Sequence, residues 1–206
     1  MKIKTIILGV SLLFSFVSCE QETEYCLNIN HNKLTTLILA QNQIDTIKAL
    51  FSHNHLDNTN YQFYNFQRDE LNYHHVKCYQ FKNNLKLFTN DLIFHFNEKN
   101  NYYFLSGEII ENITLDTNFK LSKNSVVTTF IHGMVQNNDL SGDKEAGKNS
   151  CFDIEFGYYD LNYGNNTTSK NFTKTWKIKP TNKDYPYAYI DDKSSTIIYY
   201  DNGIRD

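Results

Sequence analysis

The chain has 206 residues, a formal net charge of −3, 40% hydrophobic residues and 15% aromatic residues. The balanced charge excludes the basic excess that is typical of nucleic-acid-binding proteins. The hydrophobic and aromatic content excludes a disordered chain and predicts a packed core.

The first 18 residues predict an export signal rather than part of the fold. Two lysines precede an apolar stretch at residues 6–17, which is too short for a comfortable membrane span. The stretch ends in Val17-Ser18-Cys19, which resembles a bacterial lipobox, and this implies that Cys19 is lipidated and becomes the new N-terminus. The alternative is an ordinary secretory peptide that ends at a cysteine. We expect residues 19–32 to form a tether, whose acidic start resembles the surface-export signal of Bacteroidetes lipoproteins.

Three cysteines remain beside Cys19, so at most one disulfide can form within the chain. They are Cys26, Cys78 and Cys151. None stands in a Cys-x-x-Cys pair, so their spacing predicts no metal site. Cys78 is expected to be a small core residue of a strand, and Cys26 is expected to lie in the tether.

The next elements are a helix and a strand. Residues 34–39 are apolar but short, and they are compatible with a strand or with the first turns of a helix. Asn42 is placed to cap a helix that ends near Asn54, and residues 61–66 predict the first strand of a sheet. Apolar positions of the helix recur at helical spacing at Ile44, Ile47, Leu50 and Phe51.

Residues 76–119 predict consecutive antiparallel strands. Three runs rich in aromatic and β-branched residues, at 76–81, 85–96 and 102–110, are separated by polar turns. In the second run Phe94 alternates with Ile93 and His95, so we expect Phe94 to face the core.

The last part of the chain predicts one helix followed by more strands. Ser122 is a suitable N-cap, and Asn137-Asn138 ends the helix. Residues 152–158 and 172–179 predict strands, and residues 187–200 predict a hairpin whose turn is capped by Asp191. The apolar stripe of the helix is Val127, Phe130, Ile131, Met134 and Val135.

Residues 80–92, QFKNNLKLFTNDL, resemble the central motif of the fungalysin/thermolysin propeptide (FTP) family, QYxxGVPVFGxDL. Asn84 and Thr89 stand where that family prefers glycine. Residues 104–113 and 115–117 resemble the segments that follow in the family. The motif positions that match without gaps are Gln80, Phe88, Asp91 and Leu92.

The C-terminal strands resemble those of a PepSY domain, through Trp176-Lys177-Ile178 and through Ile190-Asp191 with Lys193 and Ile197. An FTP domain followed by a PepSY domain is the order found in propeptides of thermolysin-type metalloproteases. Such propeptides assist folding of the protease domain and block its cleft. The resemblance therefore implies a propeptide-like chain that binds, inhibits or chaperones a metalloprotease.

Catalytic residues of such a protease are missing from the sequence. No His-Glu-x-x-His motif occurs, and the pairs His53/His55 and His74/His75 are each expected to be solvated surface residues. Neighbours on a strand point to opposite faces, which separates His74 from His75 and Asp191 from Asp192. His95 is expected to be a hydrogen-bonded structural residue rather than an acid or base. We expect no enzyme activity, no metal site and no cofactor.

Tyrosines near the C-terminus offer either a recognition face or the ordinary outer side of an amphipathic sheet. They are Tyr185, Tyr187, Tyr189, Tyr199 and Tyr200. We select Tyr187 and Tyr199 as candidate partner-binding residues.

Together these patterns predict an α+β fold of two successive units, each an antiparallel sheet with a packed helix: an FTP-like domain at residues 33–120 and a PepSY-like domain at 121–206. The expected function is that of a non-catalytic lipoprotein, exported and lipid-anchored to the cell envelope, with a thermolysin-type metalloprotease as partner and no nucleic acid. The alternatives are a generic cell-surface ligand-binding lipoprotein and a degenerate remnant of a metalloprotease gene.

Overall fold

The computed structural model describes residues 25–29, 41, 45, 47–49, 52, 60–99, 101–139, 150–165, 167–181 and 183–204. The export signal, Cys19 and residues 34–39 lie outside the described residues, as do His53 and His55. Near the predicted first helix, the described residues Gln41, Asp45, 47–49 and Ser52 are helical. Ile47 is buried in the core, as its place in the apolar pattern predicts.

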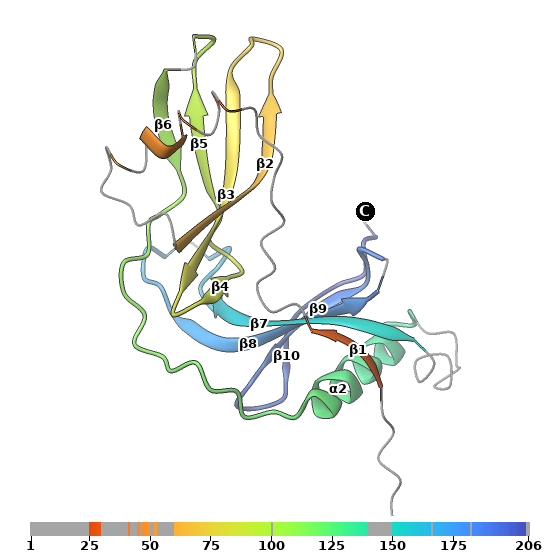
Figure 1. The fold of residues 1–206 in the computed structure, drawn as a ribbon. Helices are drawn as coiled ribbons and strands as arrows, with labels where there is room; N and C mark the ends of the chain where they lie inside the picture. The colour runs from red at the N-terminus through yellow and green to blue at the C-terminus, as the bar shows by residue number, and fades with distance from the viewer. Residues whose placement is uncertain are drawn as a thin grey trace, which may run out of the picture.

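Ten strands among the described residues form one mixed sheet that bends into two arms (Figure 1). The upper arm contains antiparallel strands, namely β2 (Tyr61–Arg68), β3 (His74–Lys82), β5 (Leu92–Phe96) and β6 (Tyr102–Ser106). The lower arm contains β4 (Leu85–Leu87), β7 (Cys151–Asp160), β8 (Phe172–Pro180), β9 (Tyr187–Asp191) and β10 (Ile197–Asp201). A further short strand, β1 (Cys26–Ile29), pairs in parallel with β7.

The predicted fold of two separate sheet-plus-helix units is wrong. Strands take 44% of the described residues and helices only 15%, and β4 joins both arms into one sheet. On one side Lys86 of β4 lies opposite Phe81 of β3, and on the other it lies opposite Gly157 of β7 in parallel. The sheet therefore continues across the boundary expected after residue 120. The sequence pattern treats residues 85–96 as a single strand-forming run. In the structure this run contains β4, a turn and β5, so the separate pairing of β4 is not visible in the pattern.

The contact between β4 and β7 requires a glycine at position 157. A Cβ atom there would lie 2.5 Å from the carbonyl oxygen of Lys86 and 2.8 Å from the ring of Phe88. Just beyond β4, the N–H of Phe88 donates to the carbonyl oxygen of Tyr158 at 2.9 Å, which extends the pairing. Because the nearest obstacle is backbone, no side-chain rotation would make room for a larger residue.

The lower arm packs on the helix α2 (Lys123–Gln136), which lies beneath β7–β10 (Figure 1). The predicted limits of this helix are confirmed. The hydroxyl of Ser122 accepts from the N–H of Ser125 at 3.1 Å, and Asn138 takes a left-handed conformation just past the end. Four of the five predicted stripe residues are buried, whereas Val135 is only half-buried.

A buried carboxylate fastens the start of α2 to the C-terminal hairpin. Asp192 is 1% exposed and accepts hydrogen bonds from the backbone N–H groups of Lys120 and Leu121 and from the indole N–H of Trp176. These three donors satisfy a charge that would be costly to bury alone. Asp192 is thus a structural clamp, and it points away from Asp191, which caps the β9–β10 turn as predicted by accepting from the N–H groups of Lys193 and Ser194.

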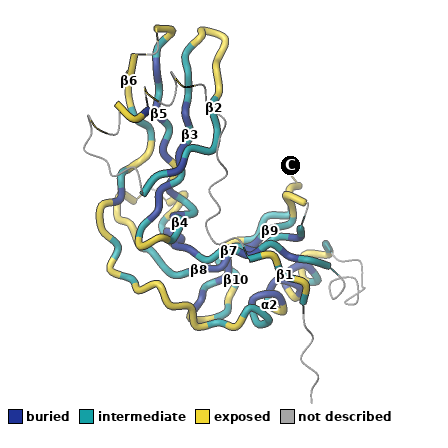
Figure 2. Tube along the Cα trace, viewed as in Figure 1, coloured by how far each residue is buried: buried dark blue, intermediate teal, exposed yellow. Residues whose placement is uncertain are grey.

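The upper arm has its own core. Buried side chains of β3 and β5 pack together with Ile47, while the outer strand β6 is exposed along much of its length (Figure 2). Phe94 is 2% exposed, which confirms its predicted inward orientation. Cys78 is also buried, as expected, and its thiol is free.

A disulfide joins Cys26 of β1 to Cys151 of β7, with Cα atoms 4.5 Å apart. The two residues are register partners in the parallel pair. The segment expected to be a tether therefore includes a strand that is covalently attached to the sheet. The two cysteines are 125 residues apart. In the chain-entropy model, a disulfide that closes a loop of this size stabilises the folded state by about 4–5 kcal/mol, because it restricts the unfolded chain.

Replacing Phe94 tests the core of the upper arm. Phe94→Ala is expected to lower the free energy of unfolding by about 3–5 kcal/mol, because a buried aromatic side chain is lost and a cavity remains. Chemical denaturation followed by circular dichroism measures the change. Leu71→Ala, at a side chain that is 72% exposed at the β2–β3 turn, is the matched control. An unchanged midpoint for Phe94→Ala would show that the side chain does not carry this core.

Replacing Gly157 tests the junction between the arms. Gly157→Ala is expected to destabilise the protein by about 1–3 kcal/mol, because the added methyl group meets the backbone of β4. The measurement is the shift of the thermal midpoint. Gly133→Ala is the comparison, since its nearest obstacle is the flexible end of the Ile197 side chain. Gly157→Ala should be the more destabilising change, and the reverse order would contradict the proposed close contact.

Candidate partner-binding face

The lower arm presents a tyrosine-rich face on the side opposite α2. Alternate residues of β7–β10 pack on the helix, and the residues between them point to the other side. We call this outer surface the tyrosine face. Its members are Glu155, Tyr159, Lys177, Tyr187, Tyr189 and Tyr199.

Tyr189 is the centre of the tyrosine face and is only 8% exposed. Its ring centroid lies 4.9 Å from that of Tyr159, 5.2 Å from Phe88, 5.8 Å from Tyr187 and 6.2 Å from Tyr199. These separations are typical of favourable aromatic pairs. The rings therefore hold one another in fixed positions.

The two predicted partner-binding residues lie side by side on this face. The ring centroids of Tyr187 and Tyr199 are 6.0 Å apart, and Tyr199 is 42% exposed. Tyr185 extends the patch, since it is 38% exposed and its ring lies 5.6 Å from that of Tyr187. The structure brings these residues together, and their role in binding remains a prediction.

Tyr200 does not belong to the face, although it was a candidate in the sequence. It packs against Phe130 of α2, and its hydroxyl donates to Asp139 at 2.6 Å. Tyr199 and Tyr200 are neighbours on β10, so their side chains point to opposite sides of the sheet. Only one of the two can face a partner there.

Two lysines border the aromatic patch. The Lys177 ammonium lies 5.4 Å from the ring centroid of Tyr187, and that of Lys86 lies 3.3 Å from the ring centroid of Tyr79. Lys86 is also 3.9 Å from a carboxylate oxygen of Glu155. Burial lowers the pKa of both lysines, and the Glu155 carboxylate opposes that change. Aromatic rings and Glu155 thus compensate in part for water that these cations have lost.

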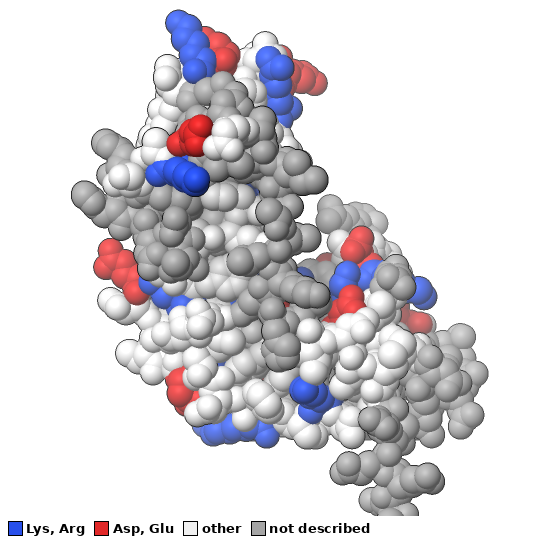
Figure 3. Space-filling view, viewed as in Figure 1, with Lys and Arg blue, Asp and Glu red and all other residues white. Residues whose placement is uncertain are grey.

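An acidic group lies in the same angle between the arms. The hydroxyl of Tyr64 donates to the carboxylate of Asp91 at 2.6 Å, and the Tyr64 ring stacks on Tyr79 at 3.8 Å. Burial raises the pKa of Asp91, while this hydrogen bond and the nearby Lys86 oppose the change. Acidic and basic side chains are intermixed in the angle between the arms (Figure 3). The surface can therefore offer aromatic contacts and hydrogen bonds together.

Sequence reasoning missed four residues around this face: Lys86, Glu155, Tyr159 and Lys177. The alternating pattern of residues 152–158 would have predicted that Glu155 and Tyr159 of β7 face outward, because they alternate with the buried positions of that strand. Lys86 has no such local signal, since only the pairing of β4 with β7 brings it there.

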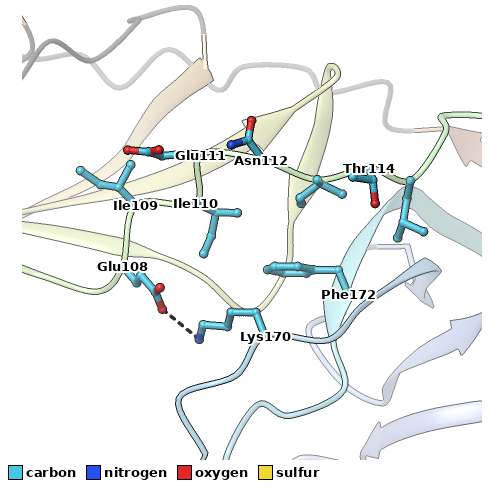
Figure 4. Close-up of a pocket in the computed structure, with 10 residues that line it drawn as sticks. Glu108, Ile109, Ile110, Glu111, Asn112, Thr114, Lys170 and Phe172 are labelled. Atoms are coloured by element: carbon cyan, nitrogen blue, oxygen red, sulfur yellow. Dashed lines mark ion pairs between the residues drawn. The ribbon is translucent and has the colours of Figure 1, made fainter.

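A second surface feature is a hollow of about 520 Å³ beside the extended segment that follows β6 (Figure 4). The side chains of Ile110 and Phe172 point into it, and Glu108 forms an ion pair with Lys170 at 3.6 Å along one side. Its volume is within the range of small-molecule sites. Among the described residues, it is lined by residues 108–115 together with Lys170 and Phe172.

Gln80 holds this hollow in shape. Its side chain is 1% exposed, donates to the carbonyl oxygen of Glu108 at 2.8 Å and accepts from the N–H of Ile110 at 3.0 Å. Asn90 donates to the same carbonyl oxygen at 2.6 Å. Gln80, the first position of the FTP-like motif, is therefore a buried residue whose side-chain hydrogen bonds fix the main chain beside the hollow.

The orientation and hydrogen bonding of the upper-arm histidines are as predicted, but one of their contacts was not anticipated. His74 and His75 are on opposite faces: His74 packs on Phe66, and His75 pairs with His95 across β3 and β5. His95 is hydrogen-bonded, as expected, to His75 and to Ser106. The pairing of His75 with His95 was not anticipated, because only the sheet register reveals it. In the described part of the chain, no group of three or more His, Cys, Asp or Glu residues is placed to hold a metal ion.

Comparison with known proteins identifies no family for this chain. No family model and no curated protein matches it. Among solved structures, it is similar to the Bacillus megaterium YpeB C-terminal domain, with 8% identity and a TM-score of 0.42. The match covers 82% of this chain and 66% of that chain, just under two thirds of its length. It is at most a distant likeness in fold, it carries no argument about function, and it gives the FTP resemblance no support.

Proposed function

We propose that this chain is a non-catalytic binding protein that recognises a protein partner through the tyrosine face. The observation that supports this most is the preorganised patch around Tyr189, from which Tyr199 and Tyr185 project to about two fifths exposure. Tyrosine is enriched at interface hot spots, and a rigid tyrosine loses little conformational entropy on binding. We propose that the chain is non-catalytic because its sequence lacks the His-Glu-x-x-His motif.

The partner that we propose is a thermolysin-type metalloprotease, which the chain inhibits or chaperones in trans. Support for this choice comes from the sequence: residues 80–92 resemble the FTP motif, and the C-terminal hairpin resembles a PepSY domain. In propeptides of this type, the C-terminal unit lies against the protease. The tyrosine face is the corresponding surface here, because β9 and β10 carry Tyr187 and Tyr199.

Binding of a small ligand is the second candidate function. The hollow beside Gln80 supports it, because this hollow combines apolar side chains with an ion pair and a fixed main chain. A ligand there would leave the tyrosine face free. The two functions are therefore separable by mutation.

We also propose that the protein is exported and anchored to the cell envelope through lipidated Cys19. The Cys26–Cys151 disulfide supports export, because such bonds persist mainly in oxidising compartments outside the cytosol. In the described part of the chain, no helix has both the length and the apolar character that a bilayer span requires.

Replacing Cys19 tests the anchor. Cys19→Ser is expected to block lipidation, so that unprocessed precursor accumulates, because the thiol is the site of acylation. Membrane fractionation and intact-mass spectrometry measure this, and Cys26→Ser is the control that should retain the lipid. Mature protein that begins elsewhere with an unmodified Cys19 would disprove the anchor and leave the binding proposal intact.

Replacing Tyr187 and Tyr199 tests the binding face. Each alanine variant is expected to weaken binding to a thermolysin-like protease of the same organism by about 30-fold, since a hot-spot side chain contributes roughly 2 kcal/mol. Inhibition kinetics and calorimetry measure the affinity. Tyr103→Ala on β6 is the control, because this tyrosine is 69% exposed and lies on the other arm.

Three outcomes separate the candidate functions. Slow-binding inhibition that weakens in Tyr187→Ala supports the protease partner. Digestion of the domain, with no binding at micromolar concentration, overturns it and leaves the ligand-binding function. Peptidase activity that follows the purified chain would overturn the non-catalytic assignment.

A further inference from the structure

The upper arm carries a pair of histidines on the side opposite its core. His75 of β3 and His95 of β5 are direct cross-strand neighbours, between positions whose side chains are buried on the other side. Their Nδ1 atoms are 2.7 Å apart, and the ring planes meet at 72°. Phe104 stacks on the His95 ring at a centroid distance of 4.0 Å and restrains it.

The outer nitrogen of His75 is held by a carboxylate. Its Nε2 lies 3.1 Å from an oxygen of Asp69, whose other oxygen accepts from the N–H groups of Leu71 and Tyr73. Because a carboxylate can only accept, Nε2 of His75 carries a hydrogen, and Nδ1 is the nitrogen that can accept from His95 or bind a metal ion.

The outer nitrogen of His95 contacts a hydroxyl, which allows either tautomer. Nε2 lies 2.8 Å from the hydroxyl oxygen of Ser106. In one tautomer Nδ1 of His95 donates to His75, and Ser106 donates to Nε2. In the other, Nε2 donates to Ser106, which can accept. The second tautomer leaves two Nδ1 lone pairs close together with both outer nitrogens satisfied.

We propose that Nδ1 of His75 and Nδ1 of His95 form a binding site for a divalent transition-metal ion, with a preference for Cu²⁺. Binding uses the second tautomer of His95, in which Nδ1 has given up its hydrogen and Nε2 has taken one by exchange with solvent, so no proton is lost overall. The ion lies beside the line that joins the two nitrogens, because two metal–nitrogen bonds of about 2.0 Å do not fit along a separation of 2.7 Å. Asp69 and Ser106 then orient the two ligands, as hydrogen-bond partners of metal-bound histidines commonly do. Water completes the coordination, because the side chain of His75 is 26% exposed.

The distance between the two nitrogens favours copper over zinc. Metal–nitrogen bonds of about 2.0–2.1 Å place cis ligands of a square-planar site about 2.8–3.0 Å apart, and tetrahedral ligands about 3.3–3.4 Å apart. The observed 2.7 Å needs only a small opening for the first geometry and a larger one for the second. Cu²⁺ adopts the first geometry and Zn²⁺ the second.

The sequence does not reveal this site because its ligands are twenty residues apart and belong to no spacing motif. Only the antiparallel register of β3 and β5 places them opposite each other. No third His, Cys, Asp or Glu in the described residues completes a cluster with them. The two imidazoles are therefore the only protein ligands proposed for the ion, and exchangeable water molecules occupy its other coordination positions.

Metal titration of the untagged, disulfide-intact mature chain tests the proposal. Calorimetry and electron paramagnetic resonance with Cu²⁺ should show one ion per chain, two equatorial nitrogens, and weaker binding of Zn²⁺. His75→Gln and His95→Gln should each weaken Cu²⁺ binding by more than tenfold. Ser106→Ala should weaken it by about 10–100-fold if its hydroxyl orients His95.

His74→Gln and His132→Gln are the matched controls. His74 is the neighbour of His75 on the opposite face of β3, and His132 is an exposed residue of α2. Both should bind Cu²⁺ like the unmodified chain. Circular dichroism confirms that every variant is folded, and Ser106→Ala keeps both ligands if a histidine variant does not fold. Absence of one-equivalent binding, or binding that survives loss of both His75 and His95, would overturn the proposal.

Discussion

The pairing of the three-residue strand β4 with β7 is the contact on which the arrangement of both arms depends. It places Leu87, which is fully buried, at the junction, and it is possible only because Gly157 leaves room for the Lys86 carbonyl. The same pairing places Lys86 beside Glu155 and places the ring centroid of Phe88 5.2 Å from that of Tyr189. The junction of the arms and the edge of the tyrosine face are thus one structural feature, so a change in the first is expected to disturb the second.

Local periodicity was sufficient for much of the fold and insufficient for its topology. The cap at Ser122, the inward side of Phe94 and the turn at Asp191 follow from neighbours close in sequence, and the structure confirms them. The parallel pairing of β4 leaves no local signal, because a strand of three residues shows no alternation and its partner lies some seventy positions away. The disulfide and the histidine pair depend on register in the same way. The error in fold class follows directly: two successive units were expected where one sheet connects distant strands.

The residues that carry the FTP resemblance have structural roles in this chain. Gln80 fastens the main chain beside the hollow, Leu92 is fully buried, and Asp91 accepts from Tyr64. A motif made of such residues reports how a turn and a strand are built, whereas function depends on the surface that the fold presents. This is why the tyrosine face, with only part of its residues visible in the sequence, supports the binding proposal independently of the motif. The case for a protease as the partner, by contrast, rests on the sequence resemblance.

The electrostatics of the angle between the arms indicate how a partner would be recognised. Two lysines, Lys86 and Lys177, stand against two carboxyl groups, Glu155 and Asp91, so the group has no net charge when all four are ionised. Burial lowers the pKa of both lysines and raises that of Asp91, so desolvation shifts these three groups toward their neutral forms. A surface of this kind offers little long-range attraction to a charged partner. Its binding energy would come instead from close contact with Tyr187 and Tyr199 and from hydrogen bonds at the edge of the patch, and added salt would change the affinity only slightly.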